Sequence, residues 1–141
     1  MANIRSDEYA QLCWDQVLCS SCMSCVVVCA ERHTGTSAPS RSHIRITLGT
    51  FDGQVSAEYC RQCVGAACAA ACPVEAISFD DELHFWRVDV ALCISCGDCV
   101  DACPFQAIRL DGVTGVAAKC DLCLGTVRCV EICPTQALIL D

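Results

Sequence analysis

The sequence has no segment of the kind that exports a protein or anchors it in a membrane. The first residues, Met1 to Gln11, are polar and charged, with neither an apolar stretch of signal-peptide length nor a twin arginine. Uninterrupted apolar runs elsewhere are only a few residues long, far short of the ~20 residues that span a bilayer. These absences predict a soluble, cytoplasmic protein without a membrane span.

Aromatic and basic residues are also scarce. The chain has 4 Phe, 2 Trp and 2 Tyr in 141 residues, and its 54% hydrophobic content includes 17 cysteines. The apolar core is therefore thin for a domain of this size, so something else must hold the fold together. The 9 basic residues face 17 acidic ones, for a formal charge of −8. This balance argues against nucleic acid and anionic membrane surfaces as partners.

Cysteine is what the sequence has in excess, far beyond the usual content of a cytoplasmic protein. Sixteen of the 17 cysteines fall into four runs of four. Runs one and three have the spacing C-x2-C-x2-C-x3-C, and the middle gap widens to four residues in run two and five in run four. The four runs are Cys19, Cys22, Cys25, Cys29; Cys60, Cys63, Cys68, Cys72; Cys93, Cys96, Cys99, Cys103; and Cys120, Cys123, Cys129, Cys133.

This spacing is typical of bacterial ferredoxins that bind [4Fe–4S] clusters. Three closely spaced thiolates converge on one cubane, while the fourth, already in a short helix, points toward a neighbouring cubane. Proline follows the last cysteine of runs two, three and four, where it ends the helix without leaving an amide unpaired. Four complete runs predict four clusters, sixteen iron atoms and no iron left open for substrate.

Two other uses of cysteine fit the pattern less well. Structural zinc sites need two pairs of ligands and not a third and fourth cysteine at these offsets. A disulfide framework needs an oxidising compartment, and the chain has no export signal. Cys13 stands outside the runs, and we interpret it as a small buried hydrophobic residue.

A nine-residue unit of the form C-P-x-x-A-[IL]-x-[FL]-D occurs three times, at 72–80, 103–111 and 133–141. Its alternating apolar positions predict a short strand after each short helix. Further strands are predicted at 43–48, 54–59 and 85–92, with a loop at 34–40. Each unit has too few apolar residues to fold alone, so metal binding is expected to supply folding free energy.

The whole arrangement resembles the four-cluster ferredoxin-like electron-transfer subunits of oxidoreductases. The stretches that look typical of this family are Tyr59-Cys60-Arg61-Gln62-Cys63, Cys103-Pro104-Phe105-Gln106-Ala107-Ile108 and Lys119-Cys120-Asp121-Leu122-Cys123. The resemblance implies an α+β fold of two tandem, interleaved bacterial ferredoxin-like modules, each with two [4Fe–4S] clusters. The outer module takes residues 1–35 with 112–141, and the inner module takes residues 36–111.

The resemblance also implies which runs exchange their fourth cysteine, a choice that spacing alone leaves open. Outer runs pair with each other, and inner runs pair with each other. The implied ligand sets are cluster A, Cys19, Cys22, Cys25 and Cys133; cluster B, Cys29, Cys120, Cys123 and Cys129; cluster C, Cys60, Cys63, Cys68 and Cys103; and cluster D, Cys72, Cys93, Cys96 and Cys99. The implied order is A–B–C–D, with A closest to the catalytic subunit.

The function we expect is electron transfer between a catalytic oxidoreductase subunit and an acceptor, without catalysis by this chain. The preferred partner is a tungsten- or molybdenum-pterin aldehyde or formate oxidoreductase of anaerobic metabolism. CO dehydrogenase, hydrogenase and a stand-alone polyferredoxin, including self-association into a longer relay, are the alternatives. A self-contained iron–sulfur enzyme would be favoured by a run lacking one cysteine, and no run lacks one.

Several other residues invite a role beside the clusters. Lys119, Arg61 and Arg128 each stand next to a cysteine in the sequence. Each is either a cation that raises the reduction potential of a nearby cluster or an ordinary solvated side chain. Trp14 and Trp86 are expected to cover cluster faces. The histidines at 33, 43 and 84 match no ligand spacing and are expected not to bind metal. The arginines at 32, 41 and 45 form either a docking patch for an acidic partner or an ordinary exposed loop.

Overall fold

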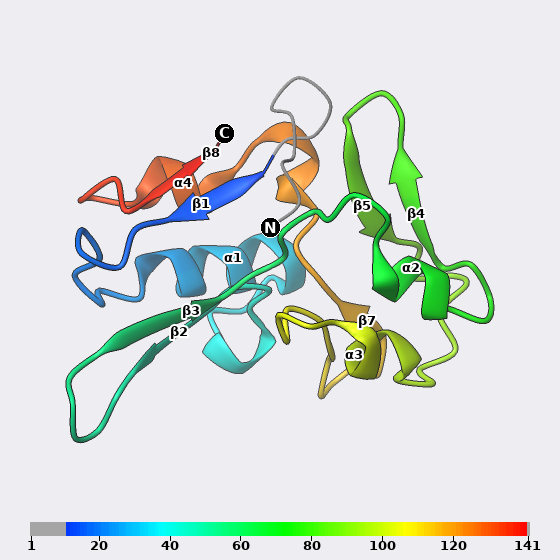
Figure 1. Cartoon of the computed structure of the whole chain (residues 1–141), viewed down its shortest axis with the longest axis horizontal. Helices are drawn as coiled ribbons and strands as arrows, with labels where there is room; N and C mark the ends of the chain where they lie inside the picture. The colour runs from blue at the N-terminus through cyan, green and yellow to red at the C-terminus, as the bar shows by residue number, and fades with distance from the viewer. Residues whose placement is uncertain (1–10, 141) are drawn as a thin grey trace.

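Short strands, paired two by two, form the frame of the protein in a computed structural model that describes residues 11–140 (Figure 1). Within these residues, each sheet consists of two antiparallel strands. The strands are β1 (Leu12–Trp14), β2 (Arg45–Leu48), β3 (Val55–Glu58), β4 (Ile77–Asp80), β5 (Phe85–Val88), β6 (Arg109–Leu110), β7 (Ala117–Ala118) and β8 (Leu138–Leu140). The strands expected around 43–48, 54–59, 77–80, 85–92 and 138–140 are therefore present, some of them shorter than expected.

Four α-helices join these strands. The longest is α1 (Ser24–Thr34), and α2 (Ala67–Ala71), α3 (Asp98–Ala102) and α4 (Arg128–Ile132) have five residues each. Two 3₁₀ turns, η1 (Pro39–Arg41) and η2 (Leu122–Gly125), complete the elements. The three short helices end at Cys72, Cys103 and Cys133, whose backbones are extended, and proline follows each of these cysteines. The expected helix-ending role of the Cys-Pro pairs is confirmed.

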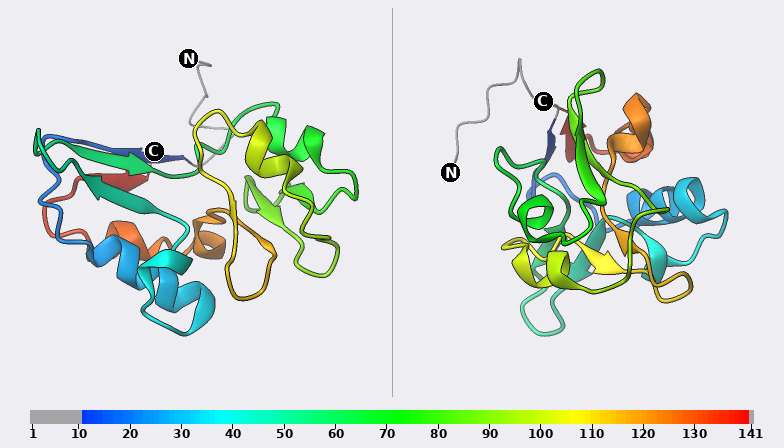
Figure 2. Two further views of the ribbon diagram at one scale, coloured as in Figure 1. Left: turned by 90° about the horizontal axis from the view of Figure 1, so that it is seen from below. Right: turned by 90° about the vertical axis from the view of Figure 1, so that its right-hand side faces the viewer.

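Segments from opposite ends of the chain lie side by side in one half of the molecule. β1 pairs with β8, with Leu12 opposite Leu140 and Trp14 opposite Leu138, and α1 packs against α4. The middle of the chain forms the other half, where β4 pairs with β5 and α2 packs against α3. In the left view of Figure 2 the blue and red segments lie toward one end of an elongated molecule, with the teal β2–β3 hairpin beside them, and the green and yellow helices α2 and α3 lie toward the other end.

Two segments pack across the boundary predicted between the modules. Ile44 and Tyr59, which flank the β2–β3 hairpin, share one core cluster with Leu12 and Leu138 of the sheet formed by the chain ends. Ala117, from the opposite side of the predicted boundary, packs in the second core cluster with Ile77, Cys99 and Ile108. The division at residues 36 and 112 remains a prediction.

Cysteine makes up much of the interior, as the thin apolar composition predicts. Six cysteines are buried: Cys29, Cys60, Cys99, Cys120, Cys123 and Cys129. Few large side chains accompany them, and Phe85, Leu12, Leu122 and Val26 are the bulkiest apolar ones that are fully enclosed. Within residues 11–140, no helix combines the length and apolar character needed to cross a bilayer.

Candidate iron–sulfur sites

The structure gathers cysteines of different runs around shared hollows. Three hollows are each lined by four cysteines. Their cysteines are those expected for clusters A, C and D: Cys19, Cys22, Cys25, Cys133; Cys60, Cys63, Cys68, Cys103; and Cys72, Cys93, Cys96, Cys99. We refer to these groups as the A, C and D sets. In each set, three thiols come from one run and the fourth from another.

The remaining four cysteines of the runs form the B set: Cys29, Cys120, Cys123 and Cys129. All four are buried. Burial raises the pKa of Cys129, and the nearby thiols of Cys29 and Cys123 raise it further, to about 12. The three sulfurs therefore lie close together. The B set also adjoins two other sets, since Cys129 interacts with Cys25 and Cys120 interacts with Cys60.

Each cysteine loop has the same unusual backbone conformation at one position. The second residue after the first cysteine has a positive φ in all four runs: Ser21 (60°), Gln62 (47°), Ser95 (61°) and Leu122 (52°). Non-glycine residues rarely adopt this conformation, because the side chain crowds the backbone. Four repetitions of one strained conformation indicate that the loops share one geometric task, which is to turn the first cysteines of each run toward a common centre.

Backbone N–H groups donate hydrogen bonds to several cysteine sulfurs. Ala76 N–H donates to Cys72 Sγ at 3.2 Å, and Ala107 N–H donates to Cys103 Sγ at 3.4 Å, at equivalent positions of the nine-residue repeat. Gln62 N–H donates to the sulfur of Cys60 in the same way. Hydrogen bonds of this kind stabilise negative charge on sulfur and tune cluster potentials.

Burial opposes ionisation of other thiols in the protein alone. It raises the pKa of Cys25 to about 11 and that of Cys68 to about 11. Iron would supply the positive charge that makes such thiolates favourable, because metal ligation deprotonates a thiol outright. Four thiols per site, three cysteine-lined hollows and N–H groups aimed at sulfur fit [4Fe–4S] clusters, which supply one-electron transfer when bound.

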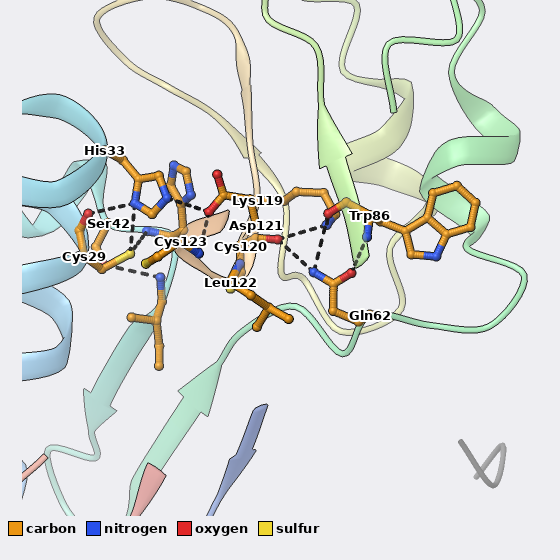
Figure 3. Close-up of polar contacts among 12 residues, drawn as sticks. Cys29, His33, Ser42, Gln62, Trp86, Lys119, Cys120, Asp121, Leu122 and Cys123 are labelled. Atoms are coloured by element: carbon orange, nitrogen blue, oxygen red, sulfur yellow. Dashed lines mark hydrogen bonds and ion pairs between the residues drawn. The ribbon is translucent and has the colours of Figure 1, made fainter. Parts of the chain in front are cut away.

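His33 and His43, which were expected not to bind metal, lie beside Cys29 of the B set. His33 Nδ1 is 2.9 Å from the carbonyl oxygen of Cys29 and 3.7 Å from its sulfur, and His33 Nε2 is 2.8 Å from Asp121 Oδ1 (Figure 3). The ring of His43 lies 4.0 Å from that of His33. His33 is four residues after Cys29 on α1, so helical periodicity was the signal in the sequence for this contact.

The charges around His33 suit a cation next to the Cys29 sulfur. Burial lowers the pKa of His33, but hydrogen bonds to Asp121 and Cys29 outweigh it and raise this pKa to about 10. Burial also opposes ionisation of Cys29, yet hydrogen bonds from His33 and Ser42 bring the pKa of this thiol below its ordinary value. Burial and the charge of His33 lower the pKa of His43 to about 4.

A second buried polar network joins the two halves of the molecule. Gln62, which is fully buried, accepts a hydrogen bond from Trp86 N–H at 2.6 Å and donates one to the Cys120 carbonyl at 2.9 Å (Figure 3). Lys119 Nζ donates to the carbonyl oxygens of Trp86 at 2.7 Å and Cys120 at 3.0 Å. The network ties β5 to the loop that presents the B set.

The other residues singled out in the sequence have mixed outcomes. Trp14 lines the hollow of the A set and Trp86 that of the C set, as expected. Arg41 binds Asp111 through two hydrogen bonds, and Arg45 forms an ion pair with Glu58. Two of the three arginines suggested as a docking patch are therefore neutralised within the chain.

Solvent access differs among the sets. Of the 17 cysteines, only Cys22 of the A set and Cys96 of the D set are exposed. The B set is wholly buried, and the C set has one buried and three partly buried cysteines. The two sets at the ends of the molecule are therefore the most accessible to another protein.

The fold and the cysteine sets define a ferredoxin-like iron–sulfur protein. The family model of the 4Fe-4S dicluster domain matches residues 51–141, and that of a 4Fe-4S binding domain matches residues 18–32. The chain belongs to this ferredoxin-like family of iron–sulfur proteins in electron transfer.

Curated relatives are subunits of several oxidoreductases. The chain is 36% identical to subunit beta of the NADH-dependent phenylglyoxylate dehydrogenase of Aromatoleum evansii, over 80% of this chain and 26% of the relative. It is 37% identical to the polyferredoxin-like subunit of the aliphatic sulfonate oxidoreductase of Pyrococcus furiosus, over 83% of this chain and 69% of the relative. The thiosulfate reductase electron transfer subunit PhsB of Salmonella typhi is 33% identical, over 84% and 64%. The chain thus spans from about a quarter to about two thirds of the length of these relatives.

Among solved structures, the active site complex BamBC of benzoyl coenzyme A reductase contains a chain with a similar fold. The TM-score is 0.56 at 22% identity, and the match covers 94% of this chain and 78% of the other. At this identity the likeness concerns the fold alone.

Proposed function

We propose that this protein is the electron-transfer subunit of an oxidoreductase, with four [4Fe–4S] clusters held by the A, B, C and D sets in two interleaved modules. The observation on which the proposal depends is the grouping of twelve cysteines around three hollows, four to each and drawn from two runs, with Cys29, Cys120 and Cys123 close to Cys129 in the B set. Every group offers four thiols, so no iron is left without a protein ligand. The protein therefore has no place to bind a substrate at iron, and the chemistry belongs to a partner.

The helices support the order A–B–C–D. On α1, Cys25 of the A set is followed one turn later by Cys29 of the B set, and α3 places Cys99 of the D set one turn before Cys103 of the C set. The B and C sets meet where Cys120 adjoins Cys60. This succession gives a single line of sites between the exposed Cys22 and the exposed Cys96.

The partner we propose is a catalytic oxidoreductase subunit in the reducing cytoplasm. A tungsten- or molybdenum-pterin enzyme is the first candidate, with hydrogenase and CO dehydrogenase next. Relatives named as subunits of thiosulfate reductase, formate hydrogenlyase and aliphatic sulfonate oxidoreductase support a catalytic partner of this general kind.

Anaerobic iron and sulfide analysis tests the cofactor proposal directly. We expect about sixteen irons and sixteen sulfides per chain, and several overlapping S = 1/2 signals after reduction by dithionite. About eight irons, or stoichiometric zinc, would contradict four clusters. Purification of the tagged protein from its own cells, with tungsten, molybdenum and nickel analysis of the bound fraction, identifies the class of partner.

A further inference from the structure

Lys119 is an unusual lysine, since only 3% of it is exposed. Lysine is almost never fully buried unless it is paired, because removing an ammonium from water costs several kcal/mol. It is also the only lysine in the sequence. Its burial therefore needs a compensating partner.

No carboxylate supplies that compensation within residues 11–140. The five ion pairs found there involve His33, Arg41, Arg45, Arg87 and Arg128. The two acceptors of Lys119 Nζ are the neutral carbonyl oxygens of Trp86 and Cys120. They satisfy two of its three N–H donors but provide no negative charge.

Two cysteine sets lie next to Lys119, and clusters bound in them would bring negative charge to it. Lys119 lines the hollow of the C set and directly precedes Cys120 of the B set. Burial raises the pKa of Cys63, Cys68 and Cys120, and the charge of Lys119 lowers all three. Lys119 lines neither the hollow of the A set nor that of the D set.

We infer that Lys119 is a buried counter-ion shared by the clusters of the B and C sets, and that it raises their reduction potentials relative to those of A and D. The inference rests on the proposed function, since it requires clusters in both sets. An oxidised cubane with four thiolates has a charge of about −2, and reduction adds one more negative charge. A buried cation stabilises the reduced form more, because little water screens the interaction.

Gln62 keeps this cation in place. Its side chain donates to the Cys120 carbonyl, which also accepts from Lys119, and it accepts from the Trp86 N–H. Lys119 and Gln62 therefore share the Cys120 carbonyl as acceptor, and both bind the backbone of Trp86, which fixes the position of Lys119 between the two sets.

The test compares Lys119→Met with Lys119→Arg, using iron analysis and EPR-monitored redox titration of the reconstituted protein. Arg128→Gln is the matched control. Arg128 directly precedes Cys129 of the B set, but its side chain is 50% exposed, so water screens its charge. We expect Lys119→Met to lower two of the four midpoint potentials by at least about 59 mV. For one electron this shift corresponds to a tenfold change in the reduction equilibrium. Lys119→Arg and Arg128→Gln should move every potential by less.

Iron analysis separates this inference from the proposed function. If the unaltered protein binds fewer than four clusters, the proposed function fails. If Lys119→Met retains sixteen irons with all four potentials unchanged, or if all four move equally, the counter-ion assignment is wrong. Should Lys119→Met not take up iron, uptake by Lys119→Arg supports the assignment, because a cation is then sufficient. Failure of Lys119→Arg as well overturns it, because shape rather than charge is then required.

Discussion

Replacing Gln62 by methionine should destabilise the protein far more than its single position suggests. Gln62 is fully buried, and its Oε1 is the acceptor for the Trp86 N–H at 2.6 Å. Methionine has a similar length but cannot accept this bond, so the Trp86 N–H is left buried and unpaired. The Cys120 carbonyl also loses the bond from Gln62 but keeps the one from Lys119.

The magnitude follows from these two losses. An unpaired buried N–H costs about 1–3 kcal/mol, and the second lost bond costs about 1 kcal/mol because its acceptor stays bonded. The free energy of unfolding should therefore fall by about 2–4 kcal/mol. If the whole loss appears in the unfolding rate, unfolding should become roughly 30-fold to 700-fold faster, at about 1.4 kcal/mol per tenfold.

The assay is anaerobic unfolding of the cluster-loaded protein in guanidinium, followed by tryptophan fluorescence and visible absorbance. Rates rather than equilibrium constants are compared, since cluster loss makes unfolding irreversible. Gln16→Met is the matched control, because Gln16 donates one hydrogen bond to Val55 from an exposed position. It should change the rate less than about threefold. A Gln62→Met rate within threefold of the Gln16→Met rate would refute the assignment of this network as a stabilising bridge.

Three further predictions concern the cysteine sets and surface charge. Cys22→Ser and Cys96→Ser should each remove about four of sixteen irons. With the catalytic partner and its substrate, Cys22→Ser should block reduction of the remaining clusters, although dithionite should still reduce them. Cys96→Ser should allow this reduction and stop only transfer to the final acceptor. The opposite pattern would reverse the order of sites. Residues 74–102 contain seven acidic residues against one arginine. Asp98→Asn should therefore slow oxidation of the reduced protein by hexaammineruthenium(III) roughly two- to threefold at low salt and not at high salt, whereas Asp52→Asn should have no effect. Asp111→Asn should lower the thermal midpoint by the same amount at pH 6 and pH 8. Arg41 holds the pKa of Asp111 well below the ordinary range, so this carboxylate is charged at both pH values. A loss of midpoint that differs between pH 6 and pH 8 would contradict this assignment.

The repeated local features were predictable from the sequence because they depend on residues close together in the chain. The Cys-Pro pairs mark where α2, α3 and α4 end, and alternating apolar residues mark β4 and β8. Both follow from short-range sterics and period-two burial. The spacing of the runs also indicated that thiols of different runs would meet.

The contacts made by distant segments were not predictable in this way. His33 meets Asp121 only because α1 packs beside the loop before η2, and no spacing encodes that packing. Lys119 and Gln62 meet at the backbone of Trp86 for the same reason. Arg41 and Arg45 looked like free surface charges because their partners, Asp111 and Glu58, lie elsewhere in the sequence. Packing, rather than local pattern, decides these pairs.

Because β1 pairs with β8, this sheet cannot form until the end of the chain has been synthesised. β1 leaves the ribosome early, at a pace of roughly 5–20 residues per second, and has no partner strand until Leu138–Leu140 follows. All thiols of the C and D sets have emerged once Cys103 has, while A and B lack members until run four is made. In the proposed arrangement of sets, the C and D sites are therefore complete during translation, before those of A and B.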